Sequence, residues 1–224
     1  MIFDMDGVIV RSEEAHWLAW REAAAARGVD LAYATFLSCF GRVNADCVRI
    51  MIGEVGPEES VRIADAKEAA MREIIRARVP LSAGLRELLA ALAADGARLA
   101  VGSSAPPENV DLVLDAGGIR AAFGAVVDGT QVRRGKPAPD VFLLAAERLG
   151  LPESGCVVIE DAPAGIRAAR SAGMAAVGVA TTHEAKELLA AGADVVYPDI
   201  PDLTTANLRE AIERNRERTC GTRT

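Results

Sequence analysis

Short apolar runs alternate with segments of helical period over most of this 224-residue chain. The apolar runs are Met1–Asp4, Arg98–Gly102, Ala125–Asp128, Cys156–Glu160, Ala175–Val179 and Val195–Tyr197. The amphipathic segments that separate them from residue 97 onward include 108–116, 139–149, 164–172 and 184–191. Strands that are apolar on both faces are typical of a parallel sheet covered by helices on both sides. The pattern therefore predicts an α/β fold.

One region breaks this alternation. Between about Ser12 and Ser82 the chain has helical period throughout and no strand candidate. We therefore expect a Rossmann-like parallel sheet core formed by residues 1–11 and 83–224, with an inserted all-helical cap domain at residues 12–82. Only three residues precede Asp4, so either the first strand lacks its first half or the true N-terminus lies upstream of Met1.

The composition excludes several classes of function. Lys and Arg number 25 against 32 Asp and Glu, a net charge of −7, so the chain has no basic field for nucleic acid. No apolar run approaches the roughly 18 residues of a membrane span. Asp4 and Asp6 stand where a secretory signal carries Lys or Arg, which argues against such a signal. The four cysteines are widely spaced, which fits buried thiols in a reduced cytoplasm better than a disulfide framework. We expect a cytoplasmic monomer or small homo-oligomer that binds neither nucleic acid nor membranes.

Four polar clusters lie at or shortly after the carboxyl ends of predicted strands. They are Asp4-Met5-Asp6-Gly7, Ser103-Ser104, Gly135-Lys136-Pro137 and Glu160-Asp161. Because the carboxyl ends of parallel strands share one edge of the sheet, we expect these clusters to converge. Several carboxylates in one place repel one another unless they are protonated or share a cation. With oxygen ligands and no His or Cys in the clusters, Mg²⁺ is the cation that fits best.

The converging groups are suited to phosphoryl transfer. Lys136 and the Ser103 hydroxyl would offer positive charge and hydrogen bonds to phosphate oxygens. A carboxylate that attacks a phosphate needs such help, because two like charges 4 Å apart cost roughly 4 kcal/mol at an effective dielectric of 20. Each cluster alone also has a structural interpretation: Ser103 as a helix N-cap, Lys136 as a solvated turn and Asp161 as a cap. Their joint occurrence at strand ends favours a ligand site.

These motifs resemble those of the haloacid dehalogenase superfamily. The matching segments are Phe3–Val8, the strand leading into Ser103-Ser104, Gly135–Asp140 and Val158–Gly165, in the superfamily's order. The helical block resembles the superfamily's helical cap. The resemblance implies a Mg²⁺-dependent phosphatase that acts on a small phosphorylated metabolite, such as a sugar phosphate, through an aspartyl-phosphate intermediate.

The resemblance also implies roles for the two aspartates of the first motif. Asp4 would be the nucleophile. Asp6 would protonate the leaving oxygen and later activate water, while its main-chain carbonyl contacts Mg²⁺. Asp4 has to stay ionised, which a cation favours, whereas Asp6 needs a raised pKa, which desolvation under a closed cap favours. Dehalogenating members lack the second aspartate, so the presence of Asp6 disfavours dehalogenation.

The other motifs would complete the site in the same way. The resemblance implies that Ser103, Ser104 and Lys136 bind the phosphoryl group, with Lys136 also restraining the nucleophile. Glu160 and Asp161 would join Asp4 and Asp6 in holding Mg²⁺.

A phosphomutase similar to β-phosphoglucomutase stays open as an alternative. The candidate substrate contacts in the cap are His16, Trp20, Arg42, Asn44 and Lys67. The mutase carries a cap arginine that grips a second phosphate, and this chain has Asn44 there, although Arg42, two residues earlier, is a candidate to take its place. This departure favours hydrolysis. Trp20 as cap core and Lys67 as part of a solvated helix face are the structural interpretations of these residues.

A phospho-accepting receiver module of signalling is a more remote alternative. Receivers also combine an acceptor aspartate, an acidic magnesium pair, a Ser or Thr and a Lys-Pro on parallel strand ends. Their acidic pair lies near the N-terminus, however, whereas Glu160-Asp161 comes late in this chain. The large helical insertion would also serve no purpose in a receiver, so the order of motifs favours an enzyme.

Overall fold

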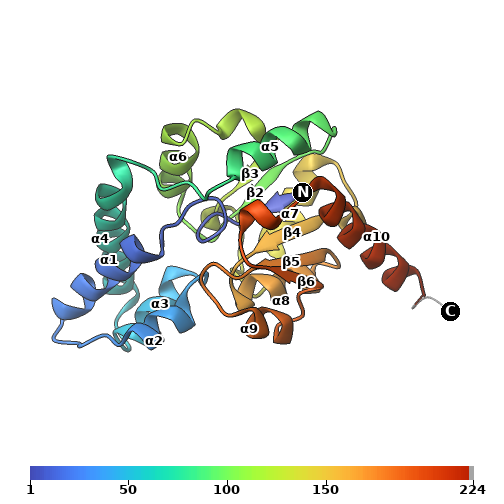
Figure 1. The fold of residues 1–224 in the computed structure, drawn as a ribbon. Coiled ribbons are helices and arrows are strands. Elements are labelled where there is room, and N and C mark those ends of the chain that lie inside the picture. Colours follow the sequence, from blue (N-terminus) through green and yellow to red (C-terminus); the bar gives the residue numbers. More distant parts are fainter. Residues whose placement is uncertain (222–224) are drawn as a thin grey trace.

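The computed structural model describes residues 1–221 and contains the predicted parallel sheet (Figure 1). Within these residues, six strands lie in the order β3-β2-β1-β4-β5-β6, and every neighbouring pair is parallel. The strands are β1 Ile2–Phe3, β2 Ala100–Gly102, β3 Ala125–Val127, β4 Val157–Glu160, β5 Ala175–Val179 and β6 Val195–Tyr197. Each lies inside a predicted apolar run, which confirms the α/β fold class.

Helices cover both faces of the sheet (Figure 1). They are α5 Leu85–Ala94, α6 Pro107–Ala116, α7 Asp140–Leu149, α8 Pro163–Ser171, α9 Ala185–Ala190 and α10 Thr205–Gly221. Short 3₁₀ turns lie at 120–122, 129–131, 153–155 and 200–202. Successive side chains of a strand face opposite sides, so Ile2 packs in one core with Phe142 and Phe3 in the other with Leu85. This double burial explains why the strands read as continuous apolar runs.

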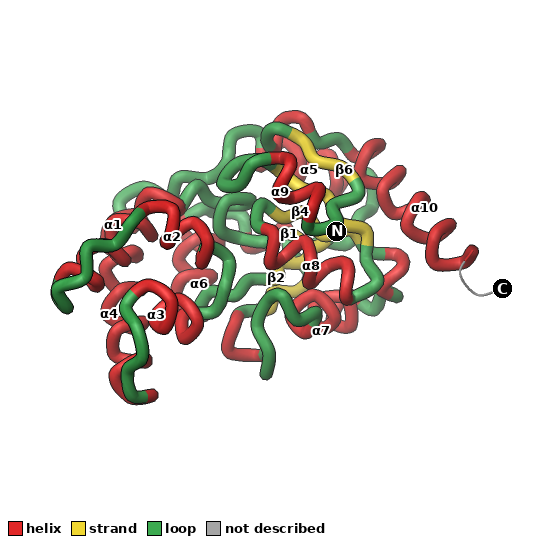
Figure 2. Tube along the Cα trace, turned by 90° about the horizontal axis from the view of Figure 1, so that it is seen from below, coloured by secondary structure: helices red, strands yellow, loops and turns green. Residues whose placement is uncertain are grey.

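The inserted segment forms a separate helical layer beside the sheet (Figure 2). Its helices are α1 Glu13–Ala25, α2 Tyr33–Cys39, α3 Asn44–Met51 and α4 Pro57–Arg76. Trp20, Phe36, Cys47, Met51 and Ile63 belong to a core of its own. The all-helical cap is thereby confirmed. No helix within the described residues is both long enough and apolar enough to cross a bilayer.

Two segments of the chain, 9–11 and 80–82, connect the sheet core to the cap and lie side by side. Val10 forms an antiparallel bridge with Leu81. The backbone N–H of Arg11 donates to the Pro80 carbonyl at 2.8 Å, and that of Ser82 donates to the Ile9 carbonyl at 3.0 Å. This pairing lies next to the predicted ends of the cap, whose boundaries at residues 11/12 and 82/83 stay a prediction.

Two glycines allow close packing at the carboxyl edge of the sheet. Gly7 has a φ of 76°, and a Cβ there would overlap the Asp161 carboxylate. Gly165 lies in the first turn of α8, where a Cβ would overlap the carboxylate of Glu160. These positions let the loop after β1 and helix α8 approach the acidic pair at the end of β4.

We expect Gly165→Ala to displace the Glu160 carboxylate and to destabilise the protein by about 1–3 kcal/mol, a typical cost of overpacking. Urea unfolding measures the change. Arg167→Ala, at an exposed position of the same helix, is the matched control and should stay within about 0.5 kcal/mol of wild type. A Gly165→Ala variant as stable as the control would contradict the close packing.

Candidate active site

Three carboxylates meet at the carboxyl edge of the sheet. Asp4 follows β1, and Glu160 and Asp161 lie at the end of β4, the strand beside it. One oxygen of each lies within 4.8 Å of the other two, and all three residues are buried. The parallel register of neighbouring strands therefore brings together residues that are more than 150 positions apart in the chain.

Lys136, from the loop before α7, inserts its ammonium between two of these carboxylates. Its Nζ donates to Asp4 Oδ1 and, at 2.8 Å, to Glu160 Oε1. It also lies 4.7 Å from the ring centroid of Phe142. Burial opposes its charge, but Asp4 and Glu160 hold the pKa of Lys136 above its usual value. A solvated turn is thus the wrong interpretation, because this side chain is 1% exposed.

The charges of the cluster do not balance within the protein. Burial, reinforced by Glu160 and Asp4, raises the pKa of Asp161 well above its usual range. Burial likewise raises the pKa of Asp4 to about 7, against the opposing charge of Lys136. Both Asp161 oxygens are buried without a hydrogen bond of regular geometry from the described residues, although the Thr182 side chain lies close enough to lower the pKa of Asp161. Such orphaned acceptors cost stability unless a ligand completes them.

The donor set fits a small divalent cation. It consists of carboxylate oxygens alone, the ligands that Mg²⁺ prefers. Glu160 is already engaged through both oxygens, by Lys136 and by the backbone N–H of Ala162 at 2.7 Å. Asp4 and Asp161 are therefore the residues best placed to hold the cation, with Glu160 behind them.

Asp6 lies in the loop after β1 and contacts the cap. Its Oδ1 accepts hydrogen bonds from the Ser12 hydroxyl and from His16 Nε2 at 3.2 Å. Burial opposes ionisation, yet the His16 ring and the hydrogen bonds from His16 and Ser12 outweigh it, so the pKa of Asp6 is lowered. The expected rise was wrong for this structure, because the cap that excludes water also brings a hydrogen-bond donor.

Ser103 and Ser104 follow β2 and line the pocket beside the carboxylates. The backbone N–H of Ala105 donates to Ser103 Oγ at 3.0 Å. Since α6 begins at Pro107, Ser103 is not its N-cap, and the Ser103 hydroxyl proton is left to donate to a ligand. The Ser104 hydroxyl is buried without a partner among the described residues. Both are thus available for phosphate oxygens.

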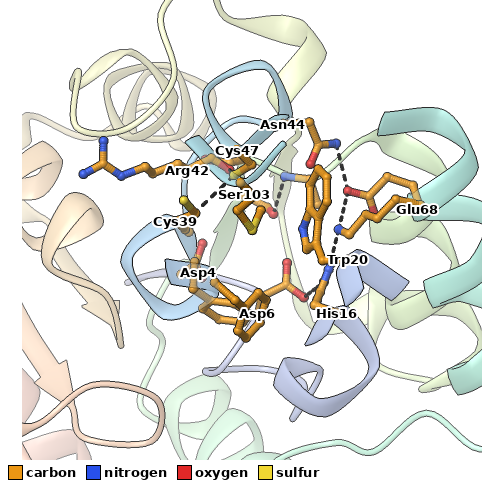
Figure 3. Close-up of a pocket in the computed structure, with 17 residues that line it drawn as sticks. Asp4, Asp6, His16, Trp20, Cys39, Arg42, Asn44, Cys47, Glu68 and Ser103 are labelled. Carbon is orange, nitrogen blue, oxygen red and sulfur yellow. Dashed lines mark hydrogen bonds and ion pairs between the residues drawn. The ribbon is translucent and has the colours of Figure 1, made fainter. Parts of the chain in front are cut away.

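The cap closes the pocket with a buried hydrogen-bond chain (Figure 3). Lys67 Nζ contacts His16 Nδ1 at 2.6 Å and donates to Glu68 Oε1 at 2.9 Å. Asn44 Nδ2 donates to the same Glu68 oxygen at 2.8 Å. Because an ammonium only donates, His16 accepts at Nδ1 and carries its proton on Nε2, which faces Asp6. Lys67 is 3% exposed, so a solvated helix face is the wrong interpretation for it.

The other two cap candidates behave differently from each other. Trp20 lines the pocket and also packs in the cap core, with Lys67 Nζ 5.0 Å from its ring centroid. Arg42 lies at the pocket wall, but its Nε donates to the Ser38 carbonyl at 3.2 Å. Its guanidinium points away from Asp4 and Asp6 (Figure 3).

Sequence reasoning missed Glu68 and its partner in the core, Asn109. Asn109 Nδ2, on α6, donates to Glu68 Oε2 at 2.6 Å, and Arg72 donates to Asn109 Oδ1 at 2.8 Å. A signal was present, since Lys67 lies four residues after Ile63 and belongs to the buried stripe of α4. Glu68 is its immediate neighbour on that face.

Sequence reasoning also missed His183. It is half-buried between two main-chain carbonyls, with Nδ1 3.1 Å from that of Asp161 and Nε2 3.3 Å from that of Leu37. It therefore joins the loop after β5 to both the acidic pair and cap helix α2. Nothing in the local sequence distinguishes it from a surface histidine.

The haloacid dehalogenase-like hydrolase family matches residues 1–173 of the chain. The chain belongs to this family. β-Phosphoglucomutase of Bacillus subtilis is 34% identical to this hydrolase over 97% of each chain. Fructose-1-phosphate phosphatase YqaB of Escherichia coli is 35% identical, over 80% of this chain and 95% of its own. The crystal structure of β-phosphoglucomutase from Clostridium difficile has a TM-score of 0.86 at 28% identity, covering 95% and 96% of the two chains.

Membership in a hydrolase family decides between an enzyme and a receiver module in favour of the enzyme. The relatives include a sugar-phosphate phosphatase and a mutase, so the hydrolase is similar in sequence to both kinds of protein. The choice between the two reactions depends on the side chains of the cap.

Lys136→Met should destabilise this hydrolase by about 3–5 kcal/mol in EDTA, because it leaves buried carboxylates without their cation. Urea unfolding measures the loss. Lys186→Met is the control: Lys186 pairs with Glu184 but is 76% exposed, and we expect a change within about 0.5 kcal/mol. Equal effects of the two substitutions would show that the buried ammonium does not hold the cluster together.

Proposed function

We propose that this hydrolase is a Mg²⁺-dependent phosphatase that releases phosphate from a small phosphorylated metabolite, a sugar phosphate, through an aspartyl-phosphate intermediate. The observation that carries the proposal is the meeting of Asp4, Lys136 and the acidic pair, with Asp4 also lining a pocket that the cap closes. The similarity to a fructose-1-phosphate phosphatase supports a sugar phosphate as the substrate.

Asp4 and Asp161 would hold the Mg²⁺, with Glu160 behind them and, as the family resemblance implies, the main-chain carbonyl of Asp6. When bound, the cation supplies positive charge that lowers the pKa of Asp4 and offsets the charge of the phosphate. This addresses the imbalance of the cluster, in which Lys136 alone faces three carboxylates.

Asp4 attacks the phosphorus of the bound ester as a carboxylate. A bond forms between Asp4 and phosphorus, and the bond from phosphorus to the substrate oxygen breaks. Lys136 and the free hydroxyls of Ser103 and Ser104 lie beside the cluster, where they can bind the phosphoryl oxygens. Water then attacks the aspartyl-phosphate, which releases phosphate and restores Asp4.

Asp6 handles the proton in both halves of the reaction. It gives a proton to the leaving oxygen, and it later takes one from the attacking water. The contacts of Ser12 and His16 favour its ionised form, which suits the second half. The negative charge of an incoming phosphate raises the pKa of Asp6 and so favours the protonated form needed for the first half.

The cap would control access to this chemistry. Core residues Asp4 and Ser103 and cap residues Trp20 and Lys67 line the same pocket, so a sugar phosphate enters when the cap swings away. Closure then excludes bulk water from the reacting groups. The paired crossings at Val10 and Leu81 are the proposed hinge.

A phosphomutase is the second candidate, favoured by the similarity to β-phosphoglucomutase over almost the whole chain. Two contacts oppose it. Asn44, which stands where the mutase resemblance implies an arginine, is bound to Glu68, and Arg42 is bound to the Ser38 carbonyl. Arg42 keeps N–H groups for a ligand, but its guanidinium points away from Asp4 and Asp6 (Figure 3), so hydrolysis is the better supported reaction.

A panel of sugar phosphates assayed with Mg²⁺, scoring free phosphate and isomerised product together, tests the proposal. We expect free phosphate as the main product and loss of activity in EDTA. Asp4→Asn should lower kcat by about a thousandfold or more because it removes the nucleophile, while Asp111→Asn, an exposed control, should not change it. Isomer without free phosphate would favour the mutase, and an active Asp4→Asn enzyme would overturn the mechanism.

A further inference from the structure

The pocket has two chemically different ends. Asp6, His16, Lys67 and Glu68 form a series of contacts at 3.2, 2.6 and 2.9 Å, which leads from the reacting carboxylates to the cap wall. Glu68 stands at the far end of this series and lines the pocket. Figure 3 shows it on the opposite side of the close-up from Asp4.

Glu68 is held as a buried, ionised carboxylate. Its side chain is 6% exposed, and it accepts hydrogen bonds from Lys67, Asn44 and Asn109. Burial opposes the charge, but the charge of Lys67 and the hydrogen bonds from Lys67 and Asn109 lower the pKa of Glu68. With three donors bound, about one of the four acceptor positions of the carboxylate is left for a ligand hydroxyl.

Lys67, the ammonium beside Glu68, is already committed. Lys67 is shared between His16 Nδ1 and Glu68 Oε1, and its ammonium lies over the ring of Trp20. Arg42 is held by the Ser38 carbonyl, and its guanidinium points out of the pocket (Figure 3). A second phosphate placed beside Glu68 would lose its water and lie beside a fixed negative charge, while Lys67 is already paired with that charge.

We propose that Glu68 is a specificity-determining residue that makes the pocket select sugar monophosphates and reject sugar bisphosphates. It accepts a hydrogen bond from a hydroxyl at the non-reacting end of the substrate, and it neutralises Lys67, which would otherwise attract a second phosphate. The inference rests on the proposed phosphatase function and names the substrate class of the same pocket.

Measurements of binding to an inactive variant test this inference independently of turnover. We would titrate the Asp4→Asn protein, with Mg²⁺, with fructose 1-phosphate and fructose 1,6-bisphosphate, and with glucose 1-phosphate and glucose 1,6-bisphosphate, in a calorimeter. For whichever pair binds, the monophosphate should bind at least about tenfold more tightly than the bisphosphate. Equal affinity, or tighter binding of the bisphosphate, would overturn the inference and leave the phosphatase proposal intact. Failure of all four ligands to bind would remove both.

Substitutions then test the residue itself. Glu68→Gln in the same background should reduce the selectivity by about fivefold or more, mainly through tighter binding of the bisphosphate. Glu73→Gln, on the exposed face of the same helix, is the matched control and should leave the selectivity unchanged. Asn44→Arg adds a cation to the same wall of the pocket and should also reduce the ratio between the affinities for the monophosphate and the bisphosphate. It provides a second test if Glu68→Gln folds poorly.

Kinetics of the active enzyme distinguish specificity from a structural role. In the active enzyme, which keeps Asp4, Glu68→Gln should lower KM for the bisphosphate relative to KM for the monophosphate, with a smaller change in kcat. A structural defect would raise KM for both substrates alike and leave the ratio of the two KM values at that of the wild-type enzyme. That result would contradict the proposal. Selective loss of bisphosphate binding in Arg42→Ala would also contradict it, because Arg42 would then be the free cation.

Discussion

The ammonium of Lys136 is the interaction on which the rest of the site depends. It joins Asp4 from β1 to Glu160 from β4, in a place where both carboxylates are shielded from water. The absence of a Cβ at Gly165 leaves space for the Glu160 carboxylate, and its absence at Gly7 leaves space for the Asp161 carboxylate. One lysine cannot compensate three buried carboxylates, so the fold itself creates the demand for a further cation.

The cap extends this buried polar system instead of merely covering it. Asp6, at the core, is linked through His16 and Lys67 to Glu68, which in turn is bound by Asn109 of the core. The series therefore begins and ends in the core and passes through the cap between. If the cap opens as proposed, it would break its contacts at Asp6 and Asn109 together, and closure would couple the protonation of Asp6 to the arrangement of the cap wall.

The sheet and the core motifs were predictable because they follow from local patterns. Apolar runs gave the strands, and the shared edge of parallel strands brought Asp4, Lys136 and Asp161 together. The partners of Glu68 and Asn109 depend instead on how α4 lies against α6, which periodicity does not specify. The pKa of Asp6 was misjudged for the same reason: burial could be anticipated, but the donor that the cap supplies could not.

A single requirement, that buried charge be compensated, gives the two ends of the pocket opposite properties. At the core end, the oxygens of Asp161 lack partners, and a cation with an attached phosphate would complete them. At the cap end, Lys67 and Glu68 compensate each other, so a charged group adds nothing favourable there, whereas a hydroxyl can share the remaining acceptor position. A sugar phosphate, the proposed substrate, has this polarity, anionic at one end and neutral at the other, so charge compensation would orient it with its ester toward Asp4.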